Sequence, residues 1–531
     1  MIRHFSSVVR TVAVPLLMVL CMFIGLSTRA HGQGSVCAEG GGSIARDEWA
    51  KPAFEWMVRQ ARVLAEKDGG PVRVVILGSM DEGTVSDAPG VSEPEQVGDR
   101  VVERFKEAGA AEVRSLYVNG SNARAEDVAA ALRGAHIVWM RGGSQSRYCE
   151  FWKGTPVEQG IRAVFDRGGV VGGTSAGCAV LGEVIYDAAG GSCDAGTALR
   201  DAHAKEISFT TGFLGLTPGV LFDTHFTERA RIARLAVFLG RIRQDLGRDV
   251  LGIGMDTRTA LCIGPDGRGE VFGTGAACIM RLTPESRIVL PAAWPEEPEA
   301  PAARGGLRDW PASPTLTDIA VRQIVAGERV NIRELVAELV SPDKIKEHAA
   351  PKATEPQTTR SQIDPKTNRF IRGDATAHAE RGMHFIDPAL PKDALFDGAL
   401  KLSAGTNEVP GTVVAVRSLS LKDRTQNAAG GVLWALATTE ARWGAFLDMA
   451  AGLRLTDAGT VESYFPFGKL GSPMSAPVFV KSATFKAGPM PVRADGQAVR
   501  QTASFDGLRM HVLGAGWGFD PETGASLPRQ R

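Results

Sequence analysis

The stretch GGVVGGTSAGCAVLGE, residues 168–183, places a turn, an apolar run and a glycine-flanked serine in close succession. Residues 173–177 read Gly-Thr-Ser-Ala-Gly, a G-x-S-x-G pattern between a short valine-rich strand and a helical run. A serine at this place sits on a tight turn, and its small neighbours let the backbone pass close to itself. The turn presents the hydroxyl of Ser175, and N–H groups at a helix start stabilise a developing oxyanion. The motif alone fits a nucleophile and a plain glycine-rich turn equally well.

Expected strands and helices alternate on both sides of this motif. We expect strands at 35–37, 72–77, 113–118, 136–140, 219–222, 250–253, 259–263, 269–274 and 278–282. We expect helices at 49–66, 97–108, 125–132, 156–166 and 227–241. Helices of this length between strands imply right-handed βαβ units and a largely parallel sheet covered on both faces. The sequence therefore predicts an α/β fold over residues 35–283.

Length and charge limit the classes of function. The chain has 531 residues, enough for two or three domains and at least one sizeable core. Its 60 basic and 60 acidic residues balance, so we expect no nucleic-acid partner.

The first 30 residues have the order of a secretory signal peptide. Arg3 and Arg10 precede an apolar run over 11–26, and small or polar residues follow as far as Ala30. The run is short for a membrane span, so we expect export to the periplasm or the cell exterior with no stable span after cleavage; an uncleaved anchor is the alternative. The six cysteines that remain permit disulfides and equally fit buried thiols. No spacing indicates zinc, and no cofactor is expected.

The composition changes after residue 283. Prolines recur between 291 and 314, which predicts a stiff connector, and residues 342–391 are polar and linker-like. Short helices are expected within 318–339. Residues 396–520 predict a separate, strand-rich α+β domain of unknown function, with strands at 412–416, 433–438 and 478–485 and one helix at 440–453.

His225 is the best candidate for the base that a nucleophilic serine needs. It follows the expected strand 219–222 and precedes a helix, so it lies at a strand's carboxyl end. Sites in open α/β sheets form at that edge, and Ser175 occupies the same kind of position. His203 is a weaker rival, and the other histidines lie in the signal, within a strand, in irregular segments or far along the chain.

The acid that would orient His225 has three candidates. Asp256 follows the strand 250–253, again at a carboxyl end. Asp223 lies two residues before His225, and side chains two apart in an extended segment share a face, so it can equally bind substrate. Glu39 ends the first expected strand.

Three arginines follow His225 on the expected helix. Arg231 and Arg234 are three apart and share a helix face, with Arg229 nearer the mouth. Grouped guanidinium groups near a serine suit carboxylate recognition, although an ordinary solvated helix face explains any one of them.

Residues 142–145, Gly-Gly-Ser-Gln, follow the strand that ends at Met140. The N–H of Gly143, together with that of Ala176, is a candidate oxyanion hole, and Gln145 is a candidate substrate ligand. A plain βα turn is the alternative.

Taken together, residues of about 35–283 resemble the cyanophycinase and aspartyl dipeptidase family of serine peptidases, family S51. The matching pieces stand in the family's order: 40–42, 141–145, 172–177, 223–226 with the three arginines, and 251–256. The resemblance implies a three-layer αβα fold with a mostly parallel sheet, flavodoxin-like and related to class I glutamine amidotransferases.

The same resemblance implies a function. Ser175 would be the nucleophile and His225 the general base of an exopeptidase that cuts β-aspartyl bonds through an acyl-enzyme. The implied substrate is cyanophycin, released as β-Asp-Arg dipeptides, or a related isoaspartyl peptide. Gln145, Asp223 and the three arginines match the family's substrate pocket, and a homodimer is an expectation by analogy.

The chain departs from the family pattern at three positions. The family's triad glutamate corresponds to Thr257, so either Asp256 takes the role, another acid serves, or activity is reduced. Thr224 replaces an amide before His225, and Glu228 replaces a glutamine before the first arginine, where it can neutralise part of the basic cluster.

Two other classes of function compete with a peptidase. An α/β-hydrolase esterase shares G-x-S-x-G but orders its triad as serine, acid, histidine, whereas here His225 precedes Asp256. A binding protein on a catalytically weakened peptidase scaffold is favoured by Thr257 and opposed by the intact Ser175 and His225.

Overall fold

The computed structural model describes residues 34–42, 48–79, 100–291 and 313–339, and shorter segments between 369 and 528. The predicted signal peptide, residues 1–30, lies outside them, and so does most of the predicted connector and linker. Among the described residues, no helix is long and apolar enough to cross a membrane.

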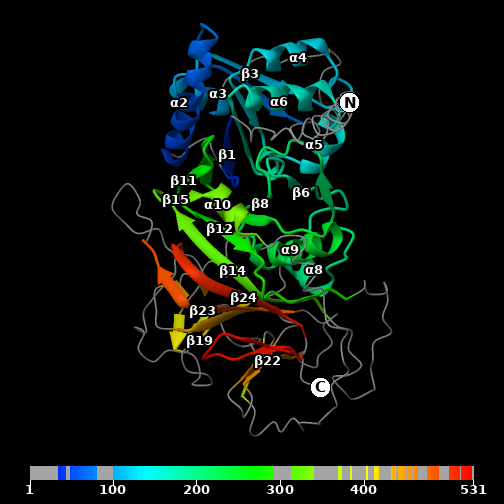
Figure 1. Cartoon of the computed structure of the whole chain (residues 1–531), viewed down its shortest axis with the longest axis vertical. Helices are drawn as coiled ribbons and strands as arrows, with labels where there is room; N and C mark the ends of the chain where they lie inside the picture. The colour runs from blue at the N-terminus through cyan, green and yellow to red at the C-terminus, as the bar shows by residue number, and fades with distance from the viewer. Residues whose placement is uncertain are drawn as a thin grey trace, which may run out of the picture.

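An eight-stranded sheet forms the first half of the fold (Figure 1). Its parallel part contains β1 (Ser35–Glu39), β5 (Val170–Thr174), β4 (Ile137–Met140), β2 (Arg73–Gly78) and β3 (Glu112–Tyr117). The antiparallel strands β10 (Thr259–Ile263), β11 (Arg268–Gly273) and β15 (Arg329–Asn331) extend it beyond β1. The central strands are apolar on both faces because helices cover both.

The side chains of β2 show how the two faces are covered. Val74 and Ile76 pack with residues of α2 (Lys51–Lys67) and α3 (Arg100–Glu107). Val75 and Leu77 point to the other face and pack with residues of α4 (Glu126–Arg133) and α6 (Pro156–Asp166). Successive side chains of a strand alternate between faces, so this one strand contributes to both cores. The three-layer α/β prediction is confirmed.

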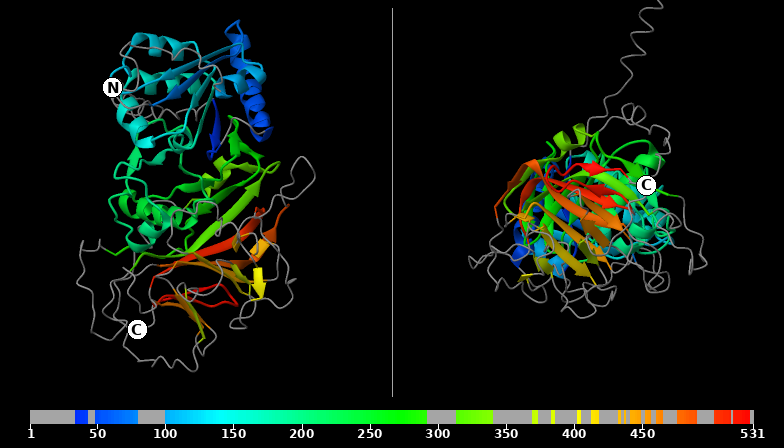
Figure 2. Two further views of the ribbon diagram at one scale, coloured as in Figure 1. Left: turned by 180° about the vertical axis from the view of Figure 1, so that it is seen from behind. Right: turned by 90° about the horizontal axis from the view of Figure 1, so that it is seen from below.

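A second, eleven-stranded sheet begins in the amino-terminal half and ends in the carboxy-terminal region (Figure 2). Its path starts with β8 (Val220–Thr224), β9 (Leu251–Met255), β12 (Ala276–Arg281) and β14 (Thr315–Val325). It continues through β24 (Phe505–Leu513), β23 (Ala476–Ala487), β20 (Trp443–Asp448), β19 (Thr412–Arg417), β17 (Met383–Phe385) and β18 (Leu402–Ala404).

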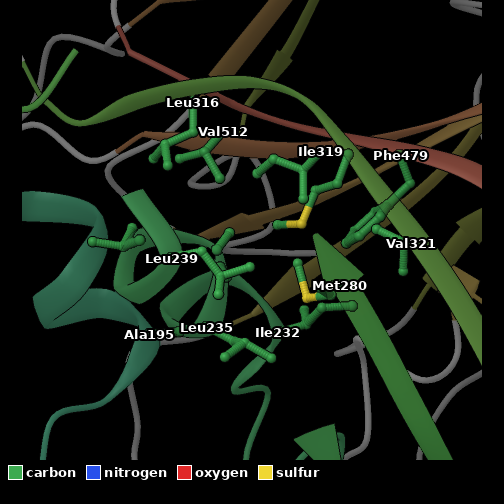
Figure 3. Packing of buried hydrophobic residues seen from close by; sticks show 14 of the residues in the cluster. Ala195, Ile232, Leu235, Leu239, Met280, Leu316, Ile319, Val321, Phe479 and Val512 are labelled. Carbon is green, nitrogen blue, oxygen red and sulfur yellow. The ribbon is translucent and has the colours of Figure 1, made fainter. Parts of the chain in front are cut away.

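The strand β14 corrects the predicted domain organisation. It lies in the segment predicted as connector and linker, yet its 11 residues pair with β12 on one side and β24 on the other. Leu235 and Leu239 of α9 (Ile232–Leu246) pack near Leu316 of β14 and Val512 of β24 in one cluster (Figure 3). The predicted strand-rich carboxy-terminal region is confirmed, and its sheet and core continue through β14 into the amino-terminal half.

Two predicted elements of the second half are wrong, and a third is confirmed in part. The expected helix 440–453 is instead occupied by the strand β20 and the start of β21 (Gly452–Leu455), because its apolar residues pair into sheets. The expected strand 433–438 has helical residues at 433, 436 and 437. Of the short helices expected in 318–339, one exists, α10 (Ile332–Ala337), beside β14 and β15.

The remaining elements are short. They are η1 (Glu48–Ala50), α5 (Gln145–Trp152), α7 (Ala176–Ala179), β6 (Val184–Tyr186), α8 (Ala195–Arg200), β7 (Phe209–Thr211), β13 (Ile288–Val289), β16 (Arg369–Arg372), β22 (Val461–Tyr464), β25 (Gly518–Phe519) and β26 (Ser526–Leu527).

The shared sheet predicts that the amino-terminal half does not fold alone. A chain that ends at Pro291 loses β14, so β12 keeps an unpaired edge and the apolar face of α9 is exposed. We expect this truncated protein to aggregate or to melt without a cooperative transition in circular dichroism and calorimetry, whereas the full chain melts cooperatively. A soluble truncated protein with a cooperative transition near that of the full chain would contradict the expectation.

Candidate active site

Ser175 stands between the end of β5 and the start of α7 in a strained backbone conformation. Its φ is 53° and its ψ is −114°. A Cβ on Gly173 would lie 2.5 Å from the carbonyl carbon of Gly177, and one on Gly177 would lie 2.2 Å from the Met140 carbonyl oxygen. Both glycines of the motif are therefore required by close backbone approach. Strain of this kind concentrates at functional sites, so the geometry favours a nucleophile over an incidental turn.

His225 reaches this serine from the other sheet. Ser175 Oγ and His225 Nε2 lie 2.9 Å apart, within hydrogen-bond distance. β5 belongs to the first sheet and β8 to the second. The pair therefore forms where the carboxyl ends of two strands from different sheets lie side by side. The sequence placed both residues correctly at carboxyl ends of strands, but it predicted a single sheet edge.

The imidazole of His225 is neutral around pH 7. Burial, followed by the charges of Arg229 and Arg231, lowers the pKa of His225 to about 3. The ring also packs on the backbone of Gly41, where a Cβ would lie 2.3 Å from His225 Cε1. A neutral ring held in this position can accept a proton from the Ser175 hydroxyl.

The predicted oxyanion residues lie on either side of Ser175. Gly142 and Gly143 are exposed, and a Cβ on Gly142 would lie 3.4 Å from Ser175 Cβ. Ala176 opens α7, so its N–H has no acceptor within that helix. Gly142, the neighbour of Gly143, therefore lies next to Ser175, and the role of Gly143 and Ala176 in stabilising an oxyanion stays a prediction.

Asp256, the predicted orienting acid, is not paired with His225 in the described part of the chain. Its Oδ1 accepts hydrogen bonds from Thr227 N at 2.9 Å and Thr227 Oγ1 at 2.7 Å, and its Oδ2 accepts one from Ala276 N at 3.0 Å. The side chain is buried, and burial together with the nearby Glu228 raises the pKa of Asp256 to about 8. These contacts assign Asp256 to holding the turn after His225 against β12.

The two other acids that the sequence offered are also occupied. Asp223 accepts a hydrogen bond from Arg234 Nε at 2.8 Å and a second one from Arg234 Nη2. Burial would raise the pKa of Asp223, but Arg234 and Arg231 hold it below its ordinary value. Glu39 is 1% exposed, and burial raises its pKa to about 8 against the opposing effect of bonds from Thr174 and the Gly41 N–H, so it is mainly neutral at pH 7.

The predicted arginine cluster divides into two buried residues and one exposed residue. The helix α9 starts at Ile232, five residues later than expected, because residues 227–231 form a turn in which Ala230 has a φ of 51°. Arg234, 1% exposed, pairs with Asp223, and Arg231 Nη1 donates to the Thr224 carbonyl at 2.6 Å. Arg229 is exposed. Of the three, Arg229 is therefore the one on the surface for a substrate to meet.

Gln145 begins α5, and its Nε2 donates to the Tyr186 carbonyl at 3.3 Å. Glu228, expected from the sequence to neutralise arginines, contacts Thr257 instead: its Oε1 accepts from Thr257 N at 2.7 Å and also from Thr257 Oγ1. Sequence reasoning identified both departures, Thr257 and Glu228, but gave no sign that the two side chains meet.

Known proteins resemble the amino-terminal half of this chain. The profile of peptidase family S51 matches residues 85–265. The cyanophycinase of Synechococcus elongatus is 34% identical over 190 residues, which are 35% of this chain and 55% of that protein. The cyanophycinase of Trichormus variabilis is 34% identical over 194 residues, 36% of this chain and 60% of that protein. The chain thus spans somewhat more than half the length of these relatives.

Two solved structures are similar to this chain at lower sequence identity. The crystal structure of a peptidase from an acI-B1 Actinobacterium matches 57% of this chain and 98% of its own, with 17% identity and a TM-score of 0.34. A putative peptidase E protein from Listeria monocytogenes matches 47% of this chain and 99% of its own, with 14% identity and a TM-score of 0.24.

The contacts of Asp256 predict a stability effect for Asp256→Asn. In either orientation the amide nitrogen replaces an oxygen that accepts from a backbone N–H, of Thr227 or of Ala276, so one buried hydrogen bond is lost. We expect unfolding free energy to fall by about 1–3 kcal/mol, with kcat near that of the unchanged protein. Calorimetry and steady-state kinetics measure the two effects. A strong loss of kcat without destabilisation would return the orienting role to Asp256.

Proposed function

Because the profile of peptidase family S51 matches residues 85–265 and the similar curated proteins are cyanophycinases, we propose that the protein is a serine exopeptidase that hydrolyses β-aspartyl peptide bonds. One observation carries the proposal: Ser175 Oγ lies 2.9 Å from His225 Nε2 on a strained turn. A solvated serine on a relaxed loop has no base to remove its proton.

The proposed reaction passes through an acyl-enzyme. His225 Nε2 takes the proton of Ser175 Oγ as the oxygen attacks the substrate carbonyl carbon. The N–H groups of Gly143 and Ala176 donate hydrogen bonds to the carbonyl oxygen and stabilise the negative charge that develops on it. His225 then protonates the departing amine, and in the second half-reaction it activates the water that hydrolyses the ester on Ser175.

The substrate class rests on the relatives and on charge at the site. The relatives described above are cyanophycinases. Arg229 is exposed on the turn that follows His225, and its guanidinium suits a carboxylate of the substrate. The signal-like residues 1–30 support export, so we propose that the peptide substrate is met outside the cytoplasm.

Two alternatives remain distinct from this proposal. A catalytically weakened binding protein is favoured by the lack of a carboxylate bonded to His225 among the described residues. An esterase of the α/β-hydrolase type is disfavoured because its triad acid stands between the serine and the histidine in the sequence. Of the three candidate acids only Asp223 stands there, and it is bonded to Arg234.

The deciding experiment compares the full chain with Ser175→Ala on cyanophycin and on β-Asp-X dipeptides. We expect release of β-aspartyl products by the unchanged protein and a loss of about 10⁴-fold or more in kcat for the variant, because the nucleophile is removed. A simple aryl ester serves as the control for esterase activity. Equal rates for the two proteins on both peptides would refute the proposal, and binding of cyanophycin without turnover would favour the binding protein.

A further inference from the structure

Among the residues that the structure describes, no carboxylate is hydrogen-bonded to the imidazole of His225. During attack the ring becomes an imidazolium, and Arg229 and Arg231 disfavour that charge. A carboxylate near Nδ1 would offset them and fix the tautomer that leaves Nε2 free to accept a proton. Asp223 is bonded to Arg234, Asp256 to the turn and β12, and Glu39 is mainly neutral.

Glu228 is the remaining acid of this region, and, like Glu39, it has one carboxylate oxygen without a hydrogen-bond partner among the described residues. Its Oε1 is bonded to Thr257, while its Oε2 is buried and has no hydrogen-bond partner among the described residues. A buried carboxylate oxygen without a donor is costly, so it calls for a partner in some state of the molecule.

Glu228 also belongs to the same turn as His225. Arg229 N donates to the His225 carbonyl at 3.3 Å and Arg231 N to the Phe226 carbonyl at 2.8 Å, so the residues from His225 to Arg231 form one compact turn.

Thr257 and the imidazole of His225 contact two successive residues, Gly42 and Gly41. The ring of His225 packs on Gly41. The next residue, Gly42, faces Thr257, because a Cβ added at Gly42 would lie 3.3 Å from the Cβ of Thr257. Thr257, to which the Glu228 carboxylate is bonded, therefore lies next to Gly42, one residue after the glycine that supports the ring.

We propose that Glu228 is the positioning carboxylate of the Ser175–His225 pair, acting on the Nδ1 side of the imidazole from the turn that follows it. The proposal rests on the proposed function. In this structure the Glu228 carboxylate is bonded to Thr257. In the proposed step the Glu228 side chain rotates as the imidazolium forms, so that its Oε2 moves to the imidazole ring. Glu228 touches neither substrate nor Ser175; it acts through His225.

The test combines Glu228→Gln with a variant that returns a carboxylate at the neighbouring position. For Glu228→Gln in the full chain we expect kcat on cyanophycin to fall about 100-fold or more with KM unchanged. Adding Thr257→Glu to Glu228→Gln should restore at least a tenth of the lost kcat, because the new side chain starts where the Glu228 carboxylate is bonded. Asp256→Asn is the matched control, since it removes a neighbouring acid whose oxygens are occupied.

The outcomes separate this proposal from the proposed function. An active protein that Ser175→Ala silences and Glu228→Gln leaves unchanged keeps the peptidase and refutes the role of Glu228. A Glu228→Gln variant with a lowered melting temperature and no recovery in the double variant also refutes it, in favour of a structural role. If cyanophycin is not cleaved at all, the rate of Ser175 labelling by a fluorophosphonate still reports His225-assisted attack: a slower rate in Glu228→Gln, restored in the double variant, supports the proposal, and equal rates overturn it.

A second inference rests on a different observation. Cys37 of β1 and Cys262 of β10 stand opposite each other in antiparallel register, with their sulfur atoms 3.4 Å apart. Residues opposite each other in such a pair have Cα atoms about 4.5–5.5 Å apart, which lies within the range that a disulfide spans. All six described cysteines are thiols in this structure.

We infer that Cys37 and Cys262 form a disulfide when the chain folds under oxidising conditions. The two thiols lose two protons and two electrons, and a thiol–disulfide oxidant such as oxidised glutathione takes them and becomes two thiols. Both side chains are buried, so the bond forms during folding and is then protected from reduction.

Refolding of the full chain in a glutathione redox buffer tests this inference. We expect non-reducing peptide mass spectrometry to recover the 37–262 crosslink, and we expect the oxidised protein to melt on the order of 5–10 °C above the reduced one. Cys37→Ser should abolish both effects, and Cys178→Ser, which removes a buried thiol elsewhere, should abolish neither. Recovery of both cysteines as thiols, or in another pairing, would overturn the inference.

Discussion

Three successive carbonyl groups at the end of β1 organise the site. The carbonyls of Glu39, Gly40 and Gly41 accept hydrogen bonds from the backbone N–H groups of Ser175 at 3.0 Å, His225 at 2.8 Å and Arg258 at 2.7 Å. All three donors have a positive φ, between 48° and 54°, which costs non-glycine residues energy. Each bond therefore holds one strained residue. Ser175, His225 and Arg258, which follow β5, β8 and β9, lie close together because all three bond to the end of β1. The Gly41 position also admits no side chain, since the His225 ring lies against it.

Much of this fold could be predicted from local pattern. The helix at 156–166 is an example, because Thr155 caps it, Pro156 begins it and its apolar residues repeat with helical period. The pair Ser175 and His225 followed from each residue standing after a strand and beside glycines. The strand β14 could not be predicted, because its pairing with β24 joins residues nearly 200 positions apart and a composition rich in proline nearby indicated a linker. Short-range propensity carries no information on such a pairing.

The roles of the charged residues were harder to predict for a related reason. The sequence places Asp223, Asp256 and the arginines near His225, but it does not say which charges are already paired. Arg234 and Asp223 neutralise each other in the interior, and Asp256 holds a turn. Burial of an ionised group requires such a partner, so the acids and bases that look most available in the sequence are often those the fold itself occupies.

The pairing of β14 with β24 also constrains how the molecule is made. Leu316 of β14 pairs with Val512 of β24. The edge of the sheet that carries His225 therefore stays unpaired until β24, a strand synthesised much later, is available. Until β24 arrives, β14 presents an open ladder and the apolar face of α9 stays uncovered, which are the features that chaperones bind and that aggregation exploits. Contacts this distant along the chain also slow folding. The sheet that carries His225 is thus completed late, so a nascent chain that already contains both Ser175 and His225 does not yet have the finished sheet behind them.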